Sequence, residues 1–161
     1  MSLYLVISYS IAINTTEGQT YNASTVAPFF VPIDTIEVEE HPFPDEDDEF
    51  EESFYVSVLA IDPVDKTNFY RLKVTVNGVR DPYGYILRDD EITINNEILM
   101  GSFNEEVVSG DIVDIELISM DEASYDYFNL VSDISQDDGG GGIVPFNPTG
   151  NFGSGVLGYF G

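Results

Sequence analysis

The segment NFGSGVLGYFG contains a G-x-G-x-x-G pattern formed by Gly153, Gly155 and Gly158. In nucleotide-binding proteins such glycines follow a strand and open a helix whose N-terminus meets the phosphate. Only three residues follow Gly158 in this chain, too few to form a helix. We therefore expect these glycines to allow a bulged or crowded closing strand, and we expect them to bind no phosphate.

A second candidate for chemistry is an acidic run in which seven of the eight residues from 45 to 52 are Asp or Glu. Carboxylate oxygens are the ligands that Ca²⁺ prefers, but the spacing of an EF-hand loop is absent. Charges of one sign at this density also favour a solvated loop. The sequence leaves both interpretations open, and the candidate calcium ligands are Asp45, Glu46, Asp47, Asp48 and Glu49.

The single histidine, His41, lies between Glu40 and Pro42, and no G-x-S-x-G nucleophile elbow is present. We expect His41 to be a surface residue. A pair of carboxylates for glycoside hydrolysis is a further hypothesis, but 30 acidic residues make any chosen pair uninformative. The sequence therefore predicts no catalytic residue and no cofactor, with Ca²⁺ as the one exception considered.

Composition narrows the class of protein. The chain has 161 residues, 5 basic residues against 30 acidic ones, and a net charge of −25. Such a surface repels nucleic acids and anionic lipids, so we expect no nucleic-acid partner. The absence of cysteine excludes disulfides, Cys-zinc sites and a lipid-bearing cysteine within this chain. A hydrophobic content of 43% is that of a globular protein.

The elements that must position these residues are mostly strands. Hydrophobic residues occupy every odd position from Leu3 to Ile13, a period of two. At eleven residues, the segment LYLVISYSIAI is too short to span a bilayer as a helix, and a strand explains it better than a signal peptide. Further strands are predicted at 19–26, 33–39, 53–61, 68–76, 83–87, 91–95, 110–118 and 156–160.

Two local signals complete the secondary structure. Asn77-Gly78 favours a tight turn with positive φ. Ser119 and Glu122 have the spacing of a capping box, and the apolar residues after them recur at helical intervals, which predicts one helix over 121–134. Many short strands and one helix indicate an all-β fold, an antiparallel β-sandwich of immunoglobulin-like or jelly-roll-like type.

Four segments, read in order, carry a resemblance: YNASTVAPFFVPIDTI, DPVDKTNFYRLKVTVNG, GDIVDIELISMDEASYDYF and NPTGNFGSGVLGYFG. From about Tyr21 to Gly161 the chain resembles a family of Bacteroidetes surface lipoproteins catalogued as a domain of unknown function, number 4249 in that series. The resemblance implies an exported protein tethered at the outer membrane, often encoded near TonB-dependent receptors, and it implies no known catalytic residues. It also implies a preceding immunoglobulin-like domain. We accordingly interpret 1–30 as an N-terminal β-hairpin, a remnant of that domain, and 31–161 as the main sandwich domain.

We therefore expect a non-enzymatic, extracytoplasmic module at the outer membrane or cell surface, accessory to a TonB-dependent receptor system. Its expected partner is an outer-membrane receptor or another surface protein. Membrane contact is expected only through a lipid anchor that this chain does not contain. The alternative is a glycan- or Ca²⁺-binding adhesion module.

Overall fold

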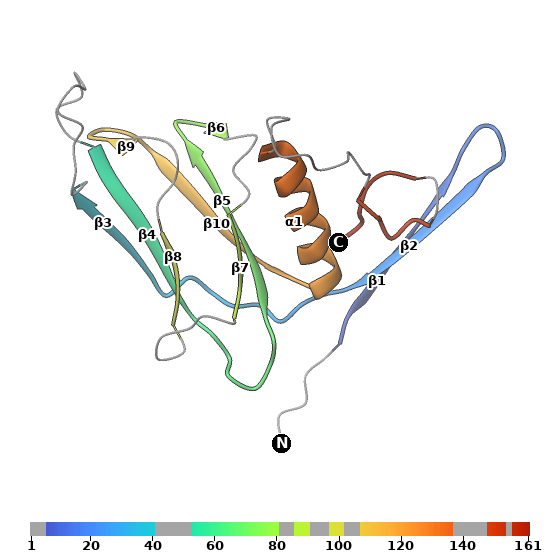
Figure 1. The fold of residues 1–161 in the computed structure, drawn as a ribbon, viewed down its shortest axis with the longest axis horizontal. Helices are drawn as coiled ribbons and strands as arrows, with labels where there is room; N and C mark the ends of the chain where they lie inside the picture. The colour runs from blue at the N-terminus through green and yellow to red at the C-terminus, as the bar shows by residue number, and fades with distance from the viewer. Residues whose placement is uncertain are drawn as a thin grey trace. The chain divides into compact units, whose positions relative to one another are not determined.

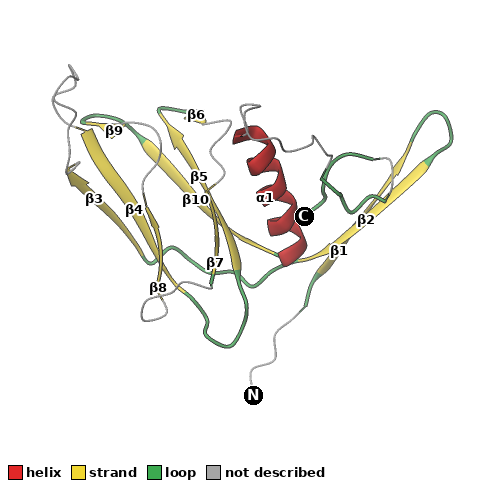
Figure 2. Cartoon of the chain, viewed as in Figure 1, coloured by secondary structure: helices red, strands yellow, loops and turns green. Residues whose placement is uncertain are grey.

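The computed structural model describes residues 6–40, 53–80, 86–90, 97–101, 107–136, 148–153 and 156–161. Within these ranges the chain forms ten strands and one helix (Figure 1 and Figure 2). The strands are β1 (Ser8–Asn14), β2 (Thr20–Val26), β3 (Thr35–Glu40), β4 (Ser53–Ile61), β5 (Phe69–Val76), β6 (Val79–Arg80), β7 (Ile86–Asp89), β8 (Glu97–Gly101), β9 (Val107–Val108) and β10 (Val113–Met120). The helix, α1, spans Glu122–Gln136.

The chain divides into two compact units. One unit is Phe30–Ser119, and the other combines Met1–Phe29 with Met120–Gly161. The second unit thus joins the N-terminal hairpin to the helix and the C-terminal segment. The interpretation of 1–30 as a remnant of another domain stays a prediction.

The unit Phe30–Ser119 contains two sheets, each of four strands. In the first sheet β4 is central, with β3 on one side and β8 and β9 pairing with it as well. All three partners run antiparallel to β4. In the second sheet β5 is central and pairs with β10, β6 and β7. Strands β3 and β10 are therefore sheet edges among the described residues.

The core of this unit lies between the two central strands. Val58 and Ala60 of β4 are buried together with Tyr70 and Leu72 of β5, and Val31 completes the cluster. In both strands these residues are two positions apart, so the period of two in the sequence places them on one face. This packing confirms the predicted all-β, sandwich-like architecture.

The turn between β5 and β6 follows the sequence signal closely. Thr75 pairs with Arg80 and Val76 with Val79, which leaves Asn77 and Gly78 as a two-residue loop. Their φ angles are 52° and 77°. Positive φ at both central positions is what a type I′ hairpin turn requires, and Asn-Gly tolerates it best.

Strands β1 and β2 form a separate antiparallel hairpin in which Ile11 lies opposite Ala23. The strand predicted from the alternation is confirmed, but most of the apolar face of β1 is exposed to solvent. Ala23 is buried and Ile11 is half-buried, whereas Ile7, Tyr9 and Ile13 are exposed. The period of two predicts which residues share a face, but it does not predict which residues cover that face.

The helix begins one residue later than predicted, and its cap is a different residue. Ser119 lies in β10 and its hydroxyl accepts a hydrogen bond from the backbone N–H of Val31 at 3.2 Å, so Ser119 caps nothing. Instead, Asp121 accepts a hydrogen bond from the backbone N–H of Ser124 at 2.7 Å. An N-cap carboxylate bonded to the third helical residue satisfies one of the free N–H groups of the first turn.

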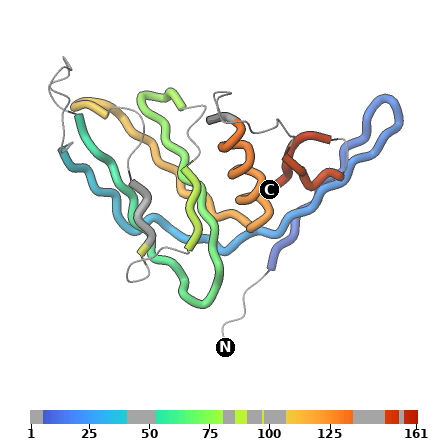
Figure 3. The backbone as a smooth tube through the Cα atoms, viewed as in Figure 1, coloured from blue at the N-terminus to red at the C-terminus, as the bar shows by residue number. Residues whose placement is uncertain are grey.

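The predicted strand at 156–160 is wrong. The described residues of this segment, 156–161, have no regular secondary structure. Gly153 and Gly158 have φ angles of 93° and 120°, which strand residues do not adopt. The segment is ordered by side-chain contacts described below, and Figure 3 shows its path at the red end of the tube.

Within the described ranges, no helix has both the length and the apolar character that crossing a bilayer requires.

The inter-sheet core gives a first test. Leu72 is fully buried, so Leu72→Ala should lower the free energy of unfolding by about 2–5 kcal/mol through lost burial and a residual cavity. Val79→Ala in β6 is the control, because Val79 is exposed and its change should stay within about 0.5 kcal/mol. Urea unfolding followed by circular dichroism measures both variants. Equal effects at the two positions would contradict the assigned core.

Candidate functional site

A groove opens between the two sheet edges of the unit Phe30–Ser119. Its volume is about 340 Å³, and apolar side chains from β3, β4, β9 and β10 form most of its lining. We call it the β3–β10 groove. Its lining residues are Ile36, Val38, Phe54, Val56, Val107, Val108, Ser109, Asp111, Val113 and Ile115.

One wall of the groove is the apolar face of β3, which lies on the interior side of its sheet. Ile36 lies opposite Val58 and Val38 opposite Val56. Directly opposed residues of an antiparallel pair share a face, so Ile36 and Val38 point to the same side as the buried valines of β4. Yet Ile36 is 48% exposed and Val38 is 60% exposed. The sandwich is therefore open along β3.

The lining of the groove includes one firmly held carboxylate. Asp111 accepts hydrogen bonds from the backbone N–H of Val108 at 2.9 Å and from Asn77 Nδ2 at 2.7 Å. The Val108 N–H, then the Asn77 amide, holds the pKa of Asp111 below its usual value. Asp111 is thus a fixed negative charge beside an apolar surface.

A buried acid and tyrosine form a second cluster in the same unit. The Tyr70 hydroxyl donates to Asp62 Oδ1 at 2.6 Å, and Asn68 Nδ2 donates to the same oxygen at 3.1 Å. The backbone N–H of Asn68 donates to Asp90 at 2.9 Å. Burial first, then the hydrogen bond to Asp62 and the nearby negative charges, raises the pKa of Tyr70 well above its usual value. Tyr70 therefore stays protonated and acts as a donor that fixes the turn after β4.

A third cluster surrounds the N-terminus of α1. The Thr25 hydroxyl donates to Asp121 Oδ2 at 2.7 Å, and the Tyr159 hydroxyl lies 3.4 Å from Asp121 Oδ1. Burial opposes ionisation of Asp121, but the hydrogen bonds from Ser124, Thr25 and Tyr159 outweigh it, and the pKa of Asp121 is lowered. One carboxylate thus ties β2, the helix and the C-terminal segment together.

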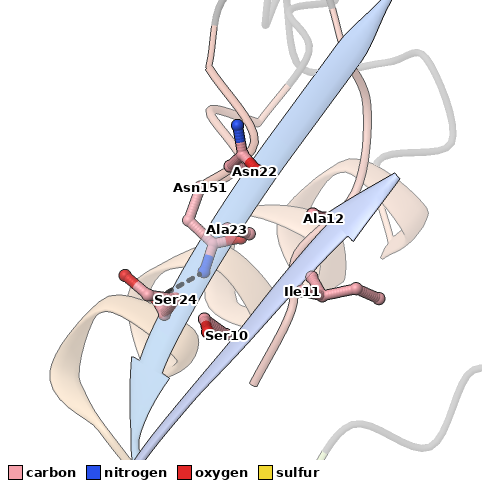
Figure 4. Close-up of a pocket in the computed structure, with 7 residues that line it drawn as sticks. All are labelled: Ser10, Ile11, Ala12, Asn22, Ala23, Ser24 and Asn151. Atoms are coloured by element: carbon pink, nitrogen blue, oxygen red, sulfur yellow. Dashed lines mark hydrogen bonds between the residues drawn. The ribbon is translucent and has the colours of Figure 1, made fainter. Parts of the chain in front are cut away.

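A polar depression lies along the β1–β2 hairpin, where Asn151 reaches the strands (Figure 4). Its volume is about 360 Å³, and its polar lining comes from Ser10, Asn22, Ser24 and Asn151. The Asn151 amide donates to Phe160 O at 2.8 Å and Ser24 O at 3.3 Å, and it accepts from the Phe160 N–H at 3.0 Å. Asn151 is therefore occupied in holding the C-terminal segment.

The described glycines of the pattern have a conformational explanation. Gly153 and Gly158 adopt positive φ, and a Cβ at Gly150 would collide with the carbonyl oxygen of Gly158. A Cβ at Gly153 or Gly158 would meet no atom, so their positive φ angles explain these two glycines, and Gly150 is the residue that allows one backbone to pass closely over another. Gly155 lies outside the described residues.

The acidic run and the histidine are not among the described residues. Asp45, Glu46, Asp47, Asp48 and Glu49 lie outside the described residues, as does His41. Within the described residues, no three His, Asp or Glu side chains gather closely enough to hold a metal ion. The calcium hypothesis for the run stays a prediction.

Sequence reasoning missed the β3–β10 groove, although part of its signal was present. The alternation of Ile36 and Val38 with Glu37 and Glu39 predicts a strand with one apolar face. The short strand β9 was not predicted. That β3 is a sheet edge depends on strand order, which the local pattern does not encode.

Comparison with known proteins gives one family. The family model described as "Domain of unknown function (DUF4249)" matches residues 7–161. The chain belongs to this family. The match begins at residue 7 and not near Tyr21 as the resemblance suggested, so the β1–β2 hairpin is part of the DUF4249 region. Neither curated proteins nor solved structures give a match to the chain.

The helix cap yields a prediction. Asp121→Ala should lower the free energy of unfolding at pH 7 by about 0.5–2 kcal/mol, because the first turn of α1 loses its cap. Asp126→Ala, an exposed position on the same helix, should change it by less than about 0.5 kcal/mol.

The pH dependence follows from the direction of the pKa shift. Because the pKa of Asp121 in the folded state is below its ordinary value of 3.8, the stabilisation that its carboxylate provides is fully present above that pH. It is lost as the pH falls through the lower, folded-state pKa. Urea titrations at pH 7 and near pH 2 measure the difference, and the gap between wild type and Asp121→Ala should shrink in acid. A gap that stayed constant would contradict the role of the ionised carboxylate.

Proposed function

We propose that this chain is a non-enzymatic binding module that acts by contact with another protein. The observation that carries the proposal is the β3–β10 groove, where Ile36 and Val38 remain exposed although they face the interior side of their sheet. An apolar surface rimmed by charged residues is typical of a protein-binding site. A module that only had to fold would gain stability by covering this face.

The setting we propose is the outer membrane or cell surface, with the chain as part of a lipoprotein accessory to a TonB-dependent receptor system. Support comes from the resemblance of the four sequence segments to surface lipoproteins. The net charge of −25 is compatible with this setting, because it favours solubility and disfavours binding to nucleic acids. The lipid anchor would belong to a part of the protein outside this chain.

A capture experiment tests the proposal. Full-length protein with an affinity tag should recover a TonB-dependent receptor from detergent-extracted outer membranes, identified by mass spectrometry. Val38→Asp should reduce the recovery about tenfold, because it places a charge in the apolar groove. Val79→Asp, at an exposed position that does not line the groove, should leave it unchanged.

Two results would contradict this function. One is equal recovery by wild type and Val38→Asp, which would separate capture from the groove. The other is turnover of a glycan or peptide panel that is abolished by a single carboxylate substitution, which would make the protein an enzyme.

The adhesion alternative has one observation in its favour, the polar depression lined by Ser10, Asn22 and Ser24. Hydroxyl and amide groups suit hydrogen bonding to a sugar. An adhesion module of the calcium type should gain several degrees in melting temperature on addition of Ca²⁺, because a ligand of the folded state stabilises it. A binding module of the kind proposed should show no calorimetric heat and no change in melting temperature.

A further inference from the structure

The β3 edge combines three properties that together specify an occupant. Its backbone edge pairs with no strand other than β4 among the described residues. Its inward side chains, Ile36 and Val38, line the β3–β10 groove. Its outward side chains include Glu37 and Glu39, which alternate with the apolar pair. A strand placed beside β3 would meet apolar and acidic neighbours in turn.

The opposite wall of the groove repeats this pattern. Val113 and Ile115 of β10 are half-buried and line the groove, while Asp114 and Glu116 are exposed between them. Glu116 forms an ion pair with Lys73 on the adjacent strand, with Lys73 Nζ 3.0 Å from Glu116 Oε2. Asp111 is part of the lining, which is otherwise mostly apolar, and acidic residues alternate with the apolar lining residues along both β3 and β10.

From these features we infer that the β3–β10 groove accepts an extended segment of a partner protein in which apolar residues alternate with Lys or Arg. This inference rests on the proposed binding function and names the mode and the chemistry of the partner. The segment adds a strand to the outer edge of β3. Its apolar side chains enter the groove, and its basic side chains lie opposite Glu37 and Glu39, since opposite charges on facing strands attract.

The charge pattern selects between this occupant and a second copy of the chain. If β3 paired with β3 of another molecule, acidic edges would face each other, and like charges on paired strands destabilise the pair. Charged residues on an edge strand are also a known protection against self-association. The acidic edge thus disfavours self-pairing while it favours a basic strand.

Synthetic peptides test the inference with the intact chain. The probe is the acetylated, amidated heptapeptide KVKIKVK, and the control is KKVIVKK, which has the same composition without the alternation. Isothermal titration calorimetry should show KVKIKVK binding about tenfold more tightly than KKVIVKK. The preference should persist when salt is added, because screening weakens attraction to the charges common to both peptides and leaves apolar docking intact.

A charge variant separates docking from simple attraction between opposite charges. Val38→Asp makes the chain more acidic, so electrostatic attraction alone would strengthen the binding of KVKIKVK. Docking in the groove predicts the opposite, a loss of about tenfold, because a charge enters an apolar site. Val79→Asp, with the same change in charge on β6, should not weaken binding. Because Val38 is 60% exposed, the variant should fold, and its melting temperature checks this.

Hydrogen exchange identifies the strand that is used. On binding of KVKIKVK, backbone amides of residues 35–40 should exchange more slowly, while those of β6 should not change. Equal affinity for the two peptides, or tighter binding by Val38→Asp, would overturn the inference. Binding of decanoate in the groove without any peptide binding would also overturn it, as would dimerisation through β3 seen by sedimentation. If a receptor is captured as proposed above but KVKIKVK does not bind, only this binding mode fails.

Discussion

The contact between β4 and β5 is the interaction on which the larger unit depends. Val58 and Ala60 from one sheet pack against Tyr70 and Leu72 from the other, and these four side chains are essentially inaccessible to solvent. Each strand is central in its own sheet, so this contact helps to join two four-stranded sheets. The phenol of Tyr70 adds a polar constraint, since its hydroxyl bonds to Asp62 at the turn that follows β4. Apolar packing and a satisfied buried hydrogen bond thus fix the same pair of strands.

The position of this core explains why the candidate site lies where it does. Packing is centred on the middle strands, and the apolar faces of the edge strands β3 and β10 extend beyond it. The β3–β10 groove leaves apolar surface exposed between them, and this lowers the stability of the fold because burial of each methylene would be favourable. Acidic residues along the same strands reduce aggregation through this surface, because charged neighbours limit contact with other apolar surfaces.

Sequence patterns predicted much of the local structure. Alternation located β1 to β5 and β10, and the Asn77-Gly78 dipeptide specified the turn between β5 and β6. The helix was predicted within a few residues, although Asp121 and not Ser119 caps it. These features depend on neighbours along the chain. The sequence pattern could not predict that the apolar faces of β1 and β3 are exposed, because exposure depends on contacts between residues far apart in sequence. The irregular C-terminal segment was mistaken for a strand because Leu157, Tyr159 and Phe160 have strand composition, whereas positive φ at Gly158 decides the backbone path.

The close approach of Gly150 and Gly158 shows how the C-terminal segment is held. Here two stretches of main chain touch without intervening side chains, and the amide of Asn151 anchors the segment from within. Such a crossing requires a residue without a side chain at position 150. In the pattern that resembles a nucleotide-binding signature, Gly153 and Gly158 are explained by their positive φ angles, whereas the close passage of two backbones requires glycine at position 150.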